Sequence, residues 1–144
     1  MGFRDPVGAV RASMAGKGAR RLLLAVWLAS IAVDAYCSLL PGLQLPGAFW
    51  NVDKLYHGAT YAWLGGLAVL AVPGRGSGRI AAASMIVLGG LLEWGQSFVP
   101  GRTASFGDAA ANAAGVVLGL WLAGLLGKKG MPPAAGGEHP PRTP

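Results

Sequence analysis

The sequence predicts an all-α membrane protein in which four transmembrane helices form a bundle and both termini lie in the cytoplasm. Hydrophobic residues make up 53% of the chain and charged residues only 12%, whereas soluble domains carry about 25% charged residues. Only eight of the eighteen charged residues fall between positions 22 and 127. Four apolar stretches in that region each approach the roughly 20 residues that cross a bilayer core. So few charges could not cover a water-exposed surface, but a lipid-exposed surface needs none.

Turn-forming residues separate the four apolar stretches. We expect the helices over residues 22–40, 53–72, 80–99 and 106–127. The breaks contain the pairs Pro41-Gly42, Pro46-Gly47, Pro73-Gly74 and Pro100-Gly101. Because proline lacks the amide proton and glycine reaches positive φ, each pair is expected to end a helix. Ser105 and Asp108 match a helix-capping signal at the start of the fourth helix.

The two ends of the chain differ in composition from the apolar region. Residues 1–21 form a basic N-terminal segment, and residues 128–144, rich in proline and glycine, are expected to be a disordered tail. The first apolar stretch could also belong to a cleaved signal peptide. Its basic leader and its apolar run both exceed the usual lengths, and no convincing cleavage site follows. We therefore predict an uncleaved membrane anchor.

The orientation follows from the distribution of lysine and arginine. The terminal segments and the loop after the second stretch would lie on one side of the membrane and hold ten basic residues. The other side would hold two, Lys54 and Arg102. Since basic loops stay in the cytoplasm, both termini are predicted to be cytoplasmic, and the protein is predicted to be a multi-pass protein of the bacterial cytoplasmic membrane.

The net charge of +6 does not require a nucleic-acid partner. The basic residues flank apolar spans, where they act as topology signals and contact anionic lipid. No separate folded basic module is present, so we predict membrane lipids as partners and no nucleic acid. The single cysteine, Cys37, excludes an intramolecular disulfide and is expected to be a packing residue.

The remaining polar residues gather at the predicted outer ends of the helices. Within the second stretch, polar residues recur every four residues and so share one face of the helix. A second group lies in and on both sides of the loop between the third and fourth stretches. The candidate site residues are Asp53, Lys54, His57, Tyr61, Glu93, Gln96, Arg102, Ser105, Asp108 and Asn112. Intramembrane ionisable residues mark function by default, so we treat these residues as one ligand-binding cluster.

Glu93 is the most informative member of the cluster because of its depth. It precedes Val99 by six residues, about 9 Å of helix. We therefore expect its carboxylate to face the other helices, toward Arg102, Lys54 or His57. Asp34 sits at a similar depth in the first stretch, and its role is left open. Simpler roles compete for several of these residues, namely helix capping by the acidic and hydroxyl groups and headgroup contact by the cations.

Small residues predict how the fourth helix packs. Gly115 and Gly119 form a G-x-x-x-G motif. In lipid, close backbone approach substitutes for the missing hydrophobic driving force, so we expect this face to pack against another helix of the same chain.

Two blocks of sequence resemble the VanZ-like family. The first contains Ser38-Leu39-Leu40-Pro41 and then Asp53-Lys54-x-x-His57-x-x-x-Tyr61-x-x-Leu64-Gly65. The second contains Glu93-x-x-Gln96-x-x-Val99-Pro100-Gly101-Arg102-x-x-Ser105-x-x-Asp108-x-x-x-Asn112-x-x-Gly115. The resemblance covers residues 22–127. It implies a small bacterial envelope membrane protein, and the namesake of the family is associated with resistance to the glycopeptide teicoplanin.

Two functional hypotheses follow. In the first, the protein is not an enzyme, and the cluster binds an anionic lipid headgroup or a lipid-linked cell-wall precursor at the outer leaflet, with Arg102 offering bidentate recognition. This hypothesis requires no cofactor and no metal. In the alternative, the protein is a membrane enzyme acting on a lipid-linked phosphate or peptide, with His57 as acid or base beside Asp53, or with a divalent metal held by Asp53, His57, Glu93 and Asp108. A proton-coupled transporter would need more than four spans unless the chain oligomerises, and the sequence leaves the oligomeric state open.

Overall fold

The computed structural model describes residues 17–42 and 52–129, and within these ranges every regular element is an α-helix. The helices are α2 (Lys17–Leu39), α3 (Val52–Ala71), α4 (Arg75–Gln96) and α5 (Phe106–Lys129). For the described residues, the prediction of an all-α structure with four helices in this order is confirmed. The predicted disordered tail from residue 130 onward, the Pro46-Gly47 turn and the first sixteen residues lie outside the described residues.

The Pro-Gly pairs end helices in the way their chemistry predicts. Gly42, Gly74 and Gly101 all adopt positive φ, at 68°, 84° and 78°. Residues other than glycine rarely adopt a positive φ, so these glycines allow the backbone to reverse direction between helices.

Three of the helices differ from the predicted spans by more than one residue. The third helix is shifted, because it starts directly after Gly74 and ends at Gln96 instead of Val99. The amides of residues 97–99 donate to carbonyl oxygens three residues earlier, which makes a tighter turn. Pro100 disfavours the helical conformation for the residue before it, which accounts for the early end. Helices α2 and α5 also extend into the basic segments, since Lys17–Arg21 and Lys128–Lys129 are helical.

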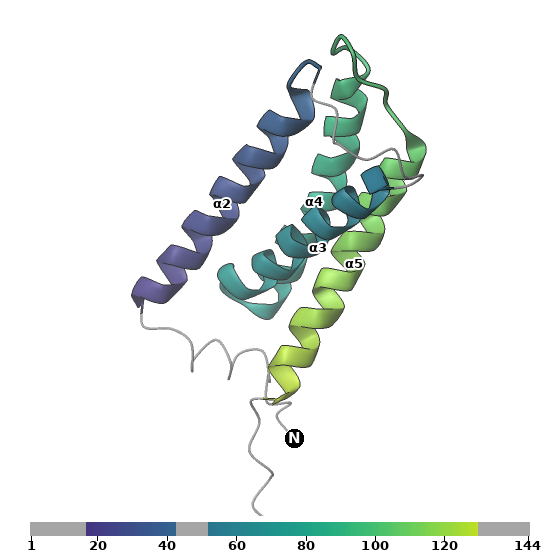
Figure 1. The fold of residues 1–144 in the computed structure, drawn as a ribbon. Helices are drawn as coiled ribbons and strands as arrows, with labels where there is room; N and C mark the ends of the chain where they lie inside the picture. The colour runs from purple at the N-terminus through teal and green to yellow at the C-terminus, as the bar shows by residue number, and fades with distance from the viewer. Residues whose placement is uncertain (1–16, 43–51, 130–144) are drawn as a thin grey trace, which may run out of the picture.

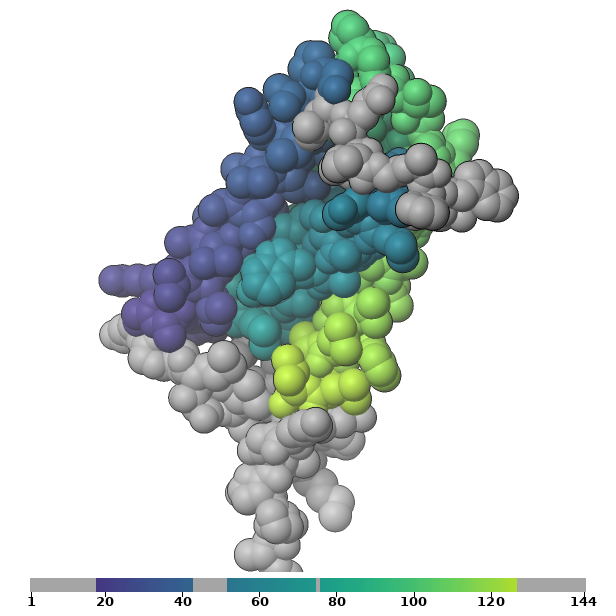
Figure 2. Space-filling view, in the orientation of Figure 1, coloured from purple at the N-terminus to yellow at the C-terminus, as the bar shows by residue number. Residues whose placement is uncertain are grey.

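Helix α3 occupies the centre of the structure and packs against each of the other three helices. Figure 1 shows α3 between α2 and α5, with α4 behind α3. In the space-filling view α3 fills the space between α2 and α5 (Figure 2). The ends of α2 and α4 and the beginnings of α3 and α5 therefore meet at one end of the molecule, where the candidate polar residues lie (Figure 1).

The packed interior is small, and much apolar surface faces outward. The largest fully buried side chains are Tyr61, Leu64 and Val116. Large apolar side chains are exposed on all four helices, among them Leu28 at 59%, Trp63 at 54% and Val87 at 64%. A soluble monomer rarely exposes this much contiguous apolar surface. Two helices, over Gly18–Leu39 and Phe106–Leu126, are long and apolar enough to cross a membrane, which is weak evidence for a membrane protein.

Candidate functional site

Small residues set the position of α5 against α3, and this contact places the polar residues of both helices together. A Cβ atom added at Gly115 would overlap with the carbonyl oxygen of Gly58, and one added at Gly119 would lie 2.8 Å from the Gly66 amide nitrogen. The two backbones therefore touch along a line of small residues that also includes Ala62 on α3.

Two polar pairs bridge α3 and α5 beyond this contact. Lys54 Nζ lies 3.2 Å from Asp108 Oδ1, and it donates a hydrogen bond to that oxygen. His57 Nδ1 lies 3.1 Å from Asn112 Oδ1. Asp108 and Asn112 are buried, at 4% and 2% exposure. Their burial is sustainable because each has a partner on α3.

Ser105 caps α5, and Glu93 completes the cap. The Gly107 amide donates to Ser105 Oγ at 3.1 Å, as expected for a capping serine. The Ser105 amide donates to Glu93 Oε1 on α4. The carboxylate that accepts from the start of α5 is thus Glu93 of α4. Asp108, which the sequence placed in the capping signal, pairs with Lys54 instead. Glu93 is 6% exposed, so it faces inward as its depth predicts. Its partner is a backbone amide, which residue types alone cannot indicate.

Arg102 ties the loop between α4 and α5 to the end of α2. Its Nη2 donates a hydrogen bond to the carbonyl oxygen of Cys37. That carbonyl belongs to the last turn of α2, where backbone oxygens lack partners within the helix. The Arg102 amide donates to Val99 O at 3.2 Å, next to the positive φ of Gly101.

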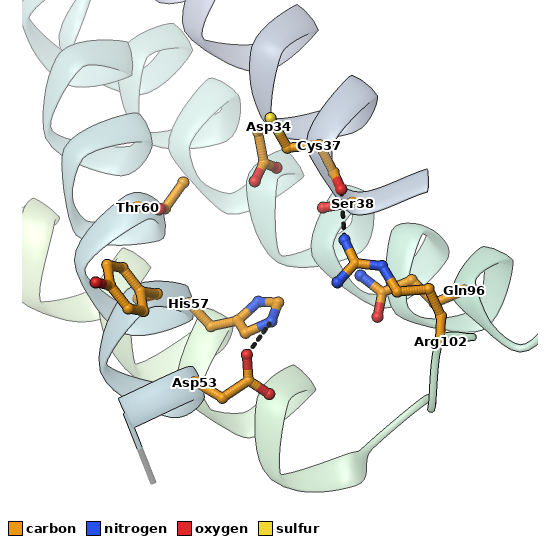
Figure 3. Close-up of a pocket in the computed structure, with 9 residues that line it drawn as sticks. Asp34, Cys37, Ser38, Asp53, His57, Thr60, Gln96 and Arg102 are labelled. Carbon is orange, nitrogen blue, oxygen red and sulfur yellow. Dashed lines mark hydrogen bonds and ion pairs between the residues drawn. The ribbon is translucent and has the colours of Figure 1, made fainter. Parts of the chain in front are cut away.

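A polar cavity of about 160 Å³ lies where α2, α3 and the loop between α4 and α5 meet. Figure 3 shows His57 and Asp53 pointing into it from α3, with Arg102, Gln96 and Ser38 across from them. The complete lining is Asp34, Cys37, Ser38, Asp53, Tyr56, His57, Thr60, Gln96 and Arg102.

Four of the ten predicted site residues line this cavity, and its other lining residues were not among the predicted ones. The α2 contribution was detectable, since Asp34 and Ser38 are spaced by four residues and share one helix face. Tyr56 and Thr60 have the same spacing beside Asp53 and His57. Asp34, whose role the sequence leaves open, accepts a hydrogen bond from Tyr61 Oη at 3.1 Å.

Glu93 and Ser105 line a second cavity instead. This cavity measures about 320 Å³ and has a mainly apolar wall that includes Trp94 and Phe106. Glu93 Oε2 is buried without a hydrogen-bond partner. Six of the ten predicted residues thus line two cavities, one polar and facing α2, the other apolar and between α4 and the start of α5. The other four, Lys54, Tyr61, Asp108 and Asn112, line neither of these cavities.

A third arrangement is suited to a cation. Asp53, His57 and Asp108 each offer one ligand atom, and these atoms all lie within 4.8 Å of one another. Glu93, the fourth residue considered for a metal, is not in this group. His57 Nε2 faces Asp53 Oδ1 at 3.8 Å, which is too long for a hydrogen bond.

Comparisons of the chain with protein-family models, with curated proteins and with solved structures gave no match.

Proposed function

We propose that this chain is an integral membrane protein in which all four helices cross the bilayer. The exposed apolar side chains on every helix support this proposal, because lipid solvates such surface at no cost. Helices α3 and α4 are not among the two helices that are apolar enough to cross a membrane, and they carry polar residues such as Asp53, His57 and Glu93. Glu93 is buried and His57 is 18% exposed at its side chain, so neither would meet lipid to a large extent.

The proposed orientation has both termini in the cytoplasm of a bacterial cell. The starts of α2 and α4, at the described end opposite the polar cavity, carry Arg20, Arg21 and Arg79, which fits the retention of basic segments inside. Reporter fusions within residues 101–104 should report an external location, and fusions within residues 74–77 a cytoplasmic one. An external signal from residues 74–77 would reverse the orientation and move the cavity to the inner leaflet.

The proposed activity is non-enzymatic recognition of an anionic group at the outer leaflet, either a lipid headgroup or a lipid-linked cell-wall precursor. The observation that carries it is the polar cavity. In a chain with 12% charged residues, that cavity gathers one arginine, one histidine and two aspartates from α2, α3 and the loop between α4 and α5. Arg102 lines the cavity and donates to the Cys37 carbonyl, and its charged planar guanidinium is the side chain best suited to recognise phosphate or carboxylate.

The resemblance to the VanZ-like family adds a biological setting to this proposal. Arg102, His57 and Asp53 belong to the two sequence blocks that carry the resemblance. On that basis the bound group would belong to the cell envelope, and loss of binding would lower glycopeptide tolerance. This setting is separate from the binding itself, so each can be tested without the other.

Binding can be tested with the full-length protein in phosphatidylcholine nanodiscs. Titration with short-chain phosphatidylglycerol and with a polyprenyl pyrophosphate should give saturable binding, measured by the change in tryptophan fluorescence. Arg102→Lys should weaken binding by about tenfold or more, because lysine keeps the charge but loses the bidentate fork. Arg79→Lys makes the same exchange on the exposed far end of α4 and should bind like the parent protein.

Three results would contradict the proposal. These are the absence of saturable binding, an equal loss in both arginine variants, and release of phosphate from the pyrophosphate probe. The last result would replace a binding role with turnover. His57→Ala should then abolish release while leaving probe binding largely intact, since an acid or base acts on the reaction step.

A further inference from the structure

We propose that Asp53, His57 and Asp108 form a site for one divalent transition-metal ion, with zinc as the best fit. The site combines one imidazole nitrogen with two carboxylate oxygens, within 4.8 Å of one another. It lies where the starts of α3 and α5 meet. It also differs from the sequence-based expectation of no metal and from the four-residue alternative that included Glu93.

The orientation of the His57 ring is the first argument. Its Nδ1 lies 3.1 Å from Asn112 Oδ1, and an amide oxygen only accepts. In the neutral tautomer that donates from Nδ1 to this oxygen, the Nε2 lone pair is directed at Asp53 Oδ1, 3.8 Å away. Two electron-pair donors that face each other at this distance suit a cation between them. Metal-binding histidines are typically held in this way, with the second ring nitrogen donating to an oxygen.

The placement of the three residues is the second argument. Asp53 and His57 are one turn apart on α3, so one helix face presents both. Asp108 reaches them because α5 packs on α3 through Gly115 and Gly58. Metal bonds of about 2.1 Å place neighbouring ligand atoms about 3.0–3.4 Å apart, so the ligand atoms must move closer by roughly 1 Å. Asp53 is 58% exposed at its side chain and free to make this rotation.

The local charge is the third argument. Asp53 and Asp108 are opposed by Lys54, whose side chain is 42% exposed. With a neutral His57 the group has a net charge of −1, and a divalent ion would change it to +1. Three protein ligands also leave one of the four zinc positions open. That position would take a phosphate or carboxylate oxygen, a step that rests on the proposed function, whereas metal binding itself does not.

Zinc alone is the probe for the test. The full-length protein, purified without a histidine tag and stripped with a chelator, is titrated with zinc chloride in detergent by calorimetry. We expect about one zinc ion per chain, and His57→Ala should weaken binding by about 10- to 100-fold or more. The matched control is His139→Ala, which removes the only other histidine of the chain and should leave binding unchanged.

A variant that should bind zinc more tightly is also needed, because misfolding could explain a loss of binding but not a gain. Lys54→Met removes the competing positive charge from Asp108 and should tighten zinc binding by about 3- to 10-fold. The absence of saturable zinc binding by the parent protein would overturn the proposal. So would unchanged binding by His57→Ala, or a loss of binding in His139→Ala. Headgroup binding measured in the presence of chelator is independent of these outcomes, so the two proposals can fail separately.

Discussion

Helices α5 and α2 both pack against α3, but they do so by different means. The α3–α5 contact is a line of small residues in which backbones touch, as at Gly115 and Gly119. The α2–α3 contact is a set of side-chain hydrogen bonds. Trp27 Nε1 donates to Leu64 O, and Tyr61 Oη donates to Asp34, each at 3.1 Å.

The difference separates the framework of the molecule from its cavity. Backbone contact leaves no room for a ligand, so the α3–α5 contact fixes the relative positions of Lys54, His57, Asp108 and Asn112. Side-chain bridges hold α2 farther away, and the polar cavity lies beneath its last turns. In lipid, where apolar burial gives helices little drive to associate, both means are needed. We expect substitutions at the first contact to destabilise the whole protein and substitutions at the second to loosen α2.

The largest effect should come from Gly119→Ala. Even one methyl group at this position overlaps with α3, where the Gly66 amide nitrogen would lie 2.8 Å from the new Cβ. Separation of the two helices should cost about 1–3 kcal/mol, by analogy with overpacked cores. The measurement is the free energy of unfolding in mixed micelles.

Gly124→Ala is the matched control for this prediction. It lies on the same helix with no atom within 4 Å of an added Cβ. Alanine favours helix over glycine, so this variant should be neutral or slightly more stable. Equal stability of both variants would show that α5 does not depend on the close contact with α3.

The contrast between the two contacts also marks what the sequence could predict. The Pro-Gly pairs and the polar spacing on α3 are local patterns, and they predicted the helix order and the shared face of Asp53 and His57. The G-x-x-x-G motif singled out Gly115 and Gly119. Its counterpart on α3, with small residues at Gly58 and Ala62, has the same spacing and was detectable in the same way.

The contacts that build the cavities could not be predicted from residue types. Arg102 donates to the Cys37 carbonyl, and Glu93 accepts from the Ser105 amide. Backbone groups occur at every position, so nothing in the sequence marks these two as partners. Glu93 is expected from the sequence to pair with a cationic or histidine side chain. In the structure it accepts from the backbone amide of Ser105 instead, because a helix start supplies amides that have no partner within the helix.

A smaller effect is expected from Tyr61→Phe, which tests the α2 bridges. The tyrosine is 1% exposed, and its hydroxyl serves Asp34 on α2. Its loss leaves a half-buried carboxylate without that donor, at a cost of about 1–2 kcal/mol. Tyr36→Phe, on an exposed tyrosine of α2, is the control and should be neutral. A spin-label pair on α2 and α3 should report a broader distance distribution for Tyr61→Phe alone, and identical distributions would argue against the bridge.

The smallest effect should come from Trp27→Phe. The indole donates to Leu64 O from a partly buried position. That oxygen belongs to the interior of α3, where it also serves the helix, so the substitution leaves no acceptor unsatisfied. Hydrogen bonds between helices in membranes average about 0.6 kcal/mol, and we expect a loss of that size. Trp121→Phe, on an exposed tryptophan of α5, controls for the change in ring size. If Trp27→Phe instead destabilised the protein as much as Gly119→Ala, α2 would be part of the framework, and the division between a rigid α3–α5 contact and a looser α2 would be wrong.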